Sequence, residues 1–201
     1  MISEAIDAVR MYRETVGDEV DLCIEIHRRL SPAEAVVLAK GIEEFHPLFY
    51  EDPILPENFD AMALVAQGIS VPIATGERLH SIHEFQMLLS RGAVQYIRPD
   101  VCLAGGITHT KKIAALAEAH YVGVVPHNPL GPISTAACLQ IAASIPNFTI
   151  QEYPLGEHEP PKSEIVNKPL ELEDGVLIIP DAPGIGIEIL DGLEEKFPVT
   201  P

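Results

Sequence analysis

The chain has 201 residues, 47% of them hydrophobic, and a net charge of −17 from 13 Lys and Arg against 30 Asp and Glu. This length can form one domain with a substantial core, whereas so acidic a surface repels phosphate backbones and anionic lipids. Nucleic acid and membranes are therefore not expected partners. No apolar run approaches the roughly 20 residues of a membrane span, and the acidic N-terminus is typical of neither a signal nor a transit peptide. We interpret Cys23, Cys102 and Cys138 as core thiols, so the sequence predicts a cytoplasmic protein.

Segments of helical period alternate with short apolar runs along most of the chain. Ser31 and Ser81 are predicted N-caps of helices, Thr108 is a third, and Pro32 suits a first helical position. The predicted helices are 3–16, 31–45, 58–67, 81–90, 108–120 and 133–143, and the predicted strands are 20–26, 48–50, 71–75, 94–98, 122–126 and 148–151. Six strands that alternate with helices predict a parallel α/β sheet.

The last part of the chain, residues 154–201, differs in composition. Prolines interrupt it repeatedly, and residues 184–189 suggest one extended stretch. We expect it to be a C-terminal segment that packs back on the sheet.

Three glutamates, Glu25, Glu51 and Glu77, follow one another at intervals of 26 residues, and each closes a short apolar run. A strand, a helix and their two loops fill roughly 25–30 residues in a (β/α) barrel, so equal spacing at strand ends brings the three carboxylates to one rim. Hard anionic oxygens that converge in this way are typical ligands of a divalent cation. The sequence therefore predicts a site for one Mg²⁺.

Two histidines are candidates for proton transfer. His27 lies two residues after Glu25, and alternation along a strand would turn both side chains to the same side. His127 closes a predicted strand, and Asp100 closes the strand before it. Adjacent strand ends lie about 5 Å apart, so we expect Asp100 to hydrogen-bond the imidazole and raise its pKa. Taken alone, Asp100 also suits a turn after a proline, and His127 an ordinary loop position.

Further polar residues complete the candidate site. Glu152 follows the last predicted strand, where it could hydrogen-bond a substrate or simply be a solvated strand end. An anionic substrate needs local cations in so acidic a protein, and Arg28, Arg78 and Arg98 could supply them together with a metal.

These motifs resemble the enolase superfamily, specifically the mandelate racemase subgroup and its acid-sugar dehydratases of galactonate dehydratase type. The resembling stretches are CIEIHRR (23–29), PLFYEDP (47–53), PIATGER (72–78), RPDVCLAGGIT (98–108), VPHNPLGP (125–132) and NFTIQE (147–152). They occur in order over nearly all of residues 18–153, which makes a chance match improbable.

The resemblance implies a TIM-like (β/α)₇β barrel. Residues 1–153 would carry its third to eighth strands and residues 154–201 a C-terminal capping segment, so the N-terminal capping domain and first two strands would be absent. An open barrel exposes a strand edge, so we expect a homo-oligomer and little activity from the isolated chain.

The resemblance also implies residue roles. Glu25, Glu51 and Glu77 would hold Mg²⁺. His127, paired with Asp100, would remove the proton α to the carboxylate of a sugar acid, and His27 would protonate the departing β-hydroxyl. This dehydration would give a 2-keto-3-deoxy acid. Glu152 would support the substrate. Together with Arg78 and Arg28, two of the local cations named above, it completes the predicted substrate-binding residues.

One residue departs from the pattern, because Glu25 stands where the family usually has Asp, and the extra methylene moves the carboxylate by about 1.5 Å. Two other functions stay open. His27 and His127 on opposite faces of a substrate could exchange one proton, as in a racemase or epimerase. The chain could also be a truncated, non-catalytic remnant.

Overall fold

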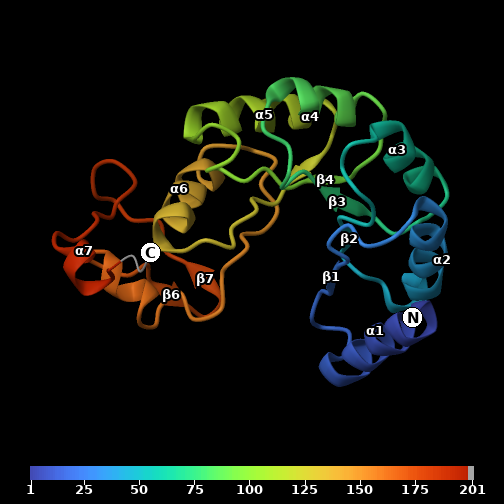
Figure 1. The fold of residues 1–201 in the computed structure, drawn as a ribbon, viewed down its shortest axis with the longest axis horizontal. Coiled ribbons are helices and arrows are strands. Elements are labelled where there is room, and N and C mark those ends of the chain that lie inside the picture. The colour runs from blue at the N-terminus through green and yellow to red at the C-terminus, as the bar shows by residue number, and fades with distance from the viewer. Residues whose placement is uncertain (199–201) are drawn as a thin grey trace.

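The structure is a computed structural model that describes residues 1–198. Five short parallel strands line the inner side of an arc of helices (Figure 1). The strands, in sheet order, are β1 Cys23–Glu25, β2 Phe49–Glu51, β3 Ile73–Thr75, β4 Tyr96–Ile97 and β5 Gly123–Val124. Because neighbours in the sheet are also neighbours in sequence and all pairs are parallel, every connection is a helical crossover. The predicted parallel α/β sheet is confirmed.

Helices cover the outer side of the strands. They are α1 Ile2–Val16, α2 Pro32–Ile42, α3 Phe59–Gln67, α4 Ile82–Leu89, α5 Ile107–Ala119 and α6 Pro132–Ala142, with a short 3₁₀ turn η1 at Glu43–Phe45. Of these, α2, α3 and α4 begin at side-chain caps. Ser31 and Ser81 each form a capping box with the glutamate three residues later. Thr108 is not a cap. The helix starts one residue earlier, at Ile107, because Gly106 adopts φ 88 and turns the chain into it.

The hydrophobic core lies between the strands and the helices. Its fully buried side chains include Tyr50, Ile73, Phe85 and Ile97. A second, smaller cluster on the inner side of the arc contains Phe49, Ala74 and Val125. Both faces of β2 and β3 are therefore covered, which explains why their sequences are apolar runs and not alternating patterns.

The predicted sixth strand, 148–151, does not form. Phe148 makes one isolated bridge with Val124, supported by two backbone hydrogen bonds of 2.8 and 2.9 Å. The ladder ends there. The segment follows the same direction as β5, but two hydrogen bonds do not make a strand.

The C-terminal segment packs on α6 through a cluster of Ala136, Leu139 and Leu170. Figure 1 shows it at the end of the arc opposite α1. The elements of this segment are η2 Lys162–Ile165, β6 Leu172–Glu173, β7 Val176–Leu177 and α7 Leu193–Lys196. The extended stretch expected at 184–189 is not a strand, and only Ile189 forms an isolated bridge, with Val166. A hairpin forms elsewhere, around 174–175, where both residues have positive φ, as a tight Asp-Gly turn requires.

The cysteine prediction is partly wrong. Cys138 is buried on α6, but Cys23 and Cys102 are exposed, and no disulfide joins them. Cys23 is exposed because β1 is an edge strand whose burial alternates. Within residues 1–198, no helix is both long and apolar enough to cross a membrane.

Candidate active site

Three carboxylates meet at the carboxyl ends of the first three strands. Glu25 and Glu51 are direct partners at the ends of β1 and β2, and Glu77 follows β3 by two residues. One oxygen from each lies within 4.8 Å of the other two. The convergence predicted from the 26-residue interval is thus present, and we call these three residues the carboxylate cluster.

The chemistry of the cluster fits a hard divalent cation. Mg²⁺ prefers oxygen ligands at about 2.0–2.1 Å, which small rotations of three carboxylates already within 4.8 Å would allow. Burial raises the pKa of Glu51 to about 8 despite the nearby Arg98, and burial likewise raises the pKa of Glu25. Both carboxyls therefore hold a proton more readily than a free glutamate does, and a bound divalent cation would favour their ionised forms.

Glu77 is the exception among the three. Burial alone would raise its pKa, but hydrogen bonds from His127 and Arg28 outweigh burial and lower the pKa to about 2. His127 Nε2 lies 3.1 Å from one Glu77 oxygen, and the Arg28 guanidinium bonds the other. Both oxygens of this predicted metal ligand are thus engaged by cationic groups of the chain.

Asp100 and His127 form the predicted pair. The two residues are partners in an isolated parallel bridge, and His127 Nδ1 lies 2.9 Å from Asp100 Oδ2. The other Asp100 oxygen accepts hydrogen bonds from the backbone N–H groups of Cys102 and Leu103, at 2.8 and 3.1 Å. Asp100 therefore stabilises its turn and orients the imidazole as well. Burial would lower the His127 pKa, but the bonds to Asp100 and Glu77 raise it to about 9.

His27 lies beside the cluster, although not by the predicted alternation. Strand β1 ends at Glu25, and His27 adopts φ 55, so its side chain does not follow the pleat of a strand. Its backbone N–H bonds a Glu25 carboxylate oxygen, and its exposed ring places Nε2 2.8 Å from Arg28 Nη2. A pocket of about 630 Å³ borders both Glu25 and His27 next to α1 and α2.

The arginines differ from one another. Arg28 lies within the site, whereas Arg78 is exposed and makes no hydrogen bond or ion pair with any residue from 1 to 198. The structure therefore does not join Arg78 to the cluster, although Arg78 directly follows Glu77 in sequence. Arg98 lies there instead. Its side chain is 5% exposed, pairs with Glu51 and places Nη2 2.7 Å from Glu152 Oε2.

Glu152 is held in place rather than free in solvent. Besides Arg98, the backbone N–H of Asn128 donates to it at 2.6 Å. The Asn128 amide in turn donates to Thr135 Oγ1 at 2.6 Å. Because Glu152 is held by a buried arginine and by a backbone N–H group, its carboxylate has a fixed position beside the cluster.

Two residues of this site were not singled out from the sequence. Asp52 is buried, bonds the Thr75 hydroxyl and lies 2.6 Å from Arg28 Nη1. Asn128 holds Glu152. Each directly follows a predicted site residue, Glu51 or His127, at the end of a strand. This adjacency in sequence is the signal from which both residues could have been predicted.

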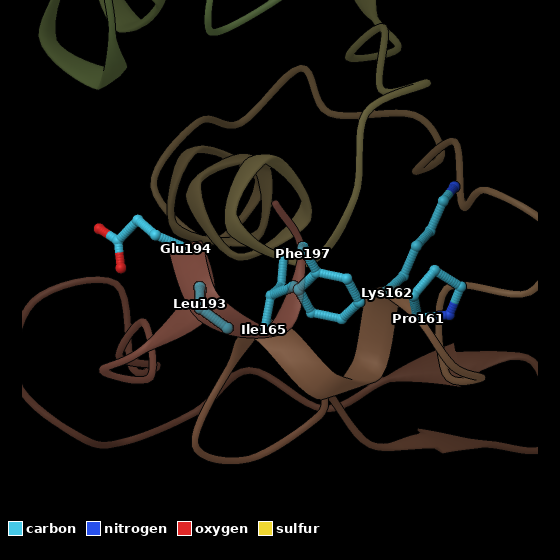
Figure 2. A pocket seen from close by; sticks show the side chains of 6 residues that line it. All are labelled: Pro161, Lys162, Ile165, Leu193, Glu194 and Phe197. Atoms are coloured by element: carbon cyan, nitrogen blue, oxygen red, sulfur yellow. The ribbon is translucent and has the colours of Figure 1, made fainter. Parts of the chain in front are cut away.

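A second pocket lies in the C-terminal segment, away from the strand ends. Figure 2 shows its lining side chains between η2 and α7, with the Phe197 ring beside Ile165. It has a volume of about 480 Å³ and is lined by Pro161, Lys162, Ile165, Leu193, Glu194 and Phe197. With a single carboxylate and no histidine, it offers none of the chemistry of the carboxylate cluster.

Comparison with known proteins agrees with this geometry. The chain belongs to the enolase C-terminal domain-like family, whose model matches residues 1–193. It is 40% identical over 200 residues to the D-galactonate dehydratase of Ralstonia pickettii strain 12J and 38% identical to that of Verminephrobacter eiseniae. These alignments cover 95% of this chain and 52% of each relative, so the chain spans about half their length.

Solved structures of the same superfamily share the fold. A mandelate racemase/muconate lactonizing enzyme-like protein from Burkholderia SAR-1 superposes with a TM-score of 0.94 at 38% identity, over 100% of this chain and 49% of its own. An enolase from Agrobacterium radiobacter with bound Na and L-malate gives 0.90 at 36% identity, over 97% of this chain and 53% of its own. The five-stranded sheet is therefore part of an enolase-type barrel.

Proposed function

We propose that this chain supports the Mg²⁺-dependent dehydration of a sugar acid to a 2-keto-3-deoxy acid. The observation that carries the proposal is the Asp100–His127 pair, whose second imidazole nitrogen, Nε2, faces the carboxylate cluster and contacts Glu77. The D-galactonate dehydratases among its relatives support the same reaction class.

His127 would act as the base. Asp100 engages Nδ1, so Nε2 is the nitrogen that would accept the proton α to the substrate carboxylate. Nε2 now contacts Glu77 at 3.1 Å, so His127 has to exchange that contact for the substrate. Mg²⁺ held by Glu25, Glu51 and Glu77 would neutralise the negative charge that grows on the substrate carboxylate as its proton leaves.

His27 would supply the proton for the departing β-hydroxyl. It is exposed beside the pocket that also borders Glu25, so a substrate that reaches the carboxylate cluster passes close to it. Glu152, fixed by Arg98 and Asn128, would hydrogen-bond the sugar hydroxyl groups. Arg28 would face the anionic end of the substrate.

The domain arrangement is part of the proposal. Residues 1–153 would form the barrel portion and residues 154–198 a C-terminal segment against it, consistent with their packing on α6. The free edge of β1 would be covered in a homo-oligomer or by further barrel strands.

Turnover in D₂O tests the chemistry. The chain is incubated with Mg²⁺ and D-galactonate, and then with other sugar acids, while keto-acid formation and deuterium at the α-carbon are followed together. Formation of keto acid by the parent chain but not by a His127→Asn control supports dehydration. Deuterium exchange without loss of water would instead indicate racemisation or epimerisation. Neither signal, in a folded protein that binds Mg²⁺, would indicate a non-catalytic chain.

A further inference from the structure

The backbone just after β1 brings an arginine into the carboxylate cluster. His27 and Arg28 have φ values of 55 and 64, a left-handed conformation that side-chain-bearing residues adopt rarely and at a cost. The Arg28 backbone N–H donates to the Asp52 carbonyl oxygen at 2.7 Å, which holds this turn against the end of β2. The turn directs the Arg28 side chain back over the strand ends instead of into solvent.

The guanidinium then serves as a cation within the site. Arg28 Nη1 lies 2.6 Å from Asp52 Oδ2 and also hydrogen-bonds a Glu77 oxygen, while its side chain is only 14% exposed. One nitrogen thus joins two carboxylates that are themselves buried. In so sheltered a place a charge-assisted contact is far stronger than at the surface.

Arg28 and a divalent metal ion compete for the Glu77 carboxylate. It is one of the three glutamates whose oxygens converge, and one of its oxygens already holds the guanidinium while the other contacts His127. A divalent ion and a guanidinium on one carboxylate repel each other at short range. Arg98 also pairs with a cluster residue, Glu51, but it is more deeply buried and is anchored by Glu152 as well.

We propose that Arg28 is an internal counter-cation of the carboxylate cluster, which a divalent metal must displace from Glu77 in order to bind. The inference rests on the proposed metal site. In addition, the Arg28 side chain would lower the metal affinity of the cluster by occupying Glu77. Displacement would free the guanidinium for the carboxylate of an anionic substrate, so metal and substrate would bind cooperatively.

Metal titration tests the competition without requiring turnover. The full chain is treated with chelator, dialysed and titrated with Mn²⁺, followed by the electron paramagnetic resonance of free Mn²⁺. The Arg28→Gln variant should bind Mn²⁺ at least about tenfold more tightly than the parent, and Arg28→Lys, which keeps the charge without the planar fork, should lie between them.

Arg91→Gln is the matched control. It changes the net charge equally, but Arg91 pairs with Asp60 instead of a cluster residue, and Asp60 is largely exposed. Its Mn²⁺ affinity should stay within about twofold of the parent. Equal or weaker Mn²⁺ binding by Arg28→Gln overturns the inference but leaves the metal site intact. Absence of Mn²⁺ binding in every variant overturns the metal site and the inference together.

Thermal unfolding gives a second readout. In chelator, Arg28→Gln should unfold at a lower temperature than the parent, because Asp52 and Glu77 lose their partner. Saturating Mn²⁺ should raise the unfolding temperature of Arg28→Gln by more than it raises that of the parent. An equal metal-induced rise in both proteins contradicts displacement, whatever the absolute stabilities are.

Discussion

At the scale of single residues, the orientation of His127 depends on Asp100. Asp100→Asn keeps the shape of the side chain but removes its charge, so the pKa of His127 should fall well below its present value of about 9. An NMR titration of the His127 ring in chelator measures this change. Asp60→Asn, at an exposed surface pair, should leave the ring unchanged. An unaltered His127 pKa in Asp100→Asn would show that Glu77 alone sets it.

The same buried groups predict how stability depends on pH. The Glu51 pKa is about 8 in the folded chain against an ordinary 4.5. The contribution of protonated Glu51 to the free energy of unfolding is therefore complete below pH 4.5 and is lost as the pH rises through 8. The raised His127 pKa acts in the same direction, with its contribution complete below 6.5 and lost through about 9. Glu77 has a lowered pKa, so its contribution is lost only in acid, as pH falls toward 2.

We therefore expect the metal-free chain to lose stability between about pH 4.5 and 9, and most steeply between 6.5 and 8, where both groups contribute, by at most about 1.4 kcal/mol per pH unit for each proton. Urea denaturation at a series of pH values in chelator measures the slope. Glu51→Gln should flatten it, because that side chain does not titrate. A stability that is constant or rising over this range would contradict the raised pKa values.

At the scale of elements, one glycine sets the approach of Glu77 to the cluster. Gly76, directly after β3, has φ 136, and a Cβ there would lie 2.8 Å from the Phe85 ring and 3.2 Å from the Arg98 backbone nitrogen. Gly76→Ala should therefore push β3, α4 and β4 apart and cost about 2 kcal/mol or more of unfolding free energy.

Gly92→Ala is the control for this change. Gly92 also has a positive φ, of 61, but nothing lies within 4 Å of its built Cβ, so only backbone strain of about 1 kcal/mol is expected. Urea unfolding of both variants isolates the contribution of the contact. Similar losses in the two would show that the space around Gly76 can relax.

At the scale of the whole molecule, the sheet has an open edge on β1, and the Phe148 segment pairs on one side only. Unpaired backbone groups beside an apolar pocket favour association, so we expect the purified chain to form a homo-oligomer. Light scattering coupled to size-exclusion chromatography measures its mass. A stable monomer at micromolar concentration would contradict this expectation.

Much of this architecture follows from local sequence. Five short apolar runs become parallel strands because each is followed by a helix, and Ser31 and Ser81 mark two of the helix starts through side-chain chemistry that needs no distant partner. The interval of 26 residues between glutamates is likewise a property of the repeating unit, so it predicts their convergence. The Asp100–His127 pair follows in the same way from adjacent strand ends.

Other features are decided only by tertiary structure. The 148–151 segment has the composition of a strand but makes only two backbone hydrogen bonds to its neighbour. Arg78 directly follows Glu77 yet is exposed, whereas Arg28, three residues after Glu25, is bonded within the site. Which arginine turns inward depends on the left-handed backbone after β1, and that turn is held by a bond to Asp52 on the neighbouring strand. Sequence thus places residues at strand ends through local periodicity, whereas pairing across strands determines which charges meet, because Coulomb and hydrogen-bond energies depend on distances in space.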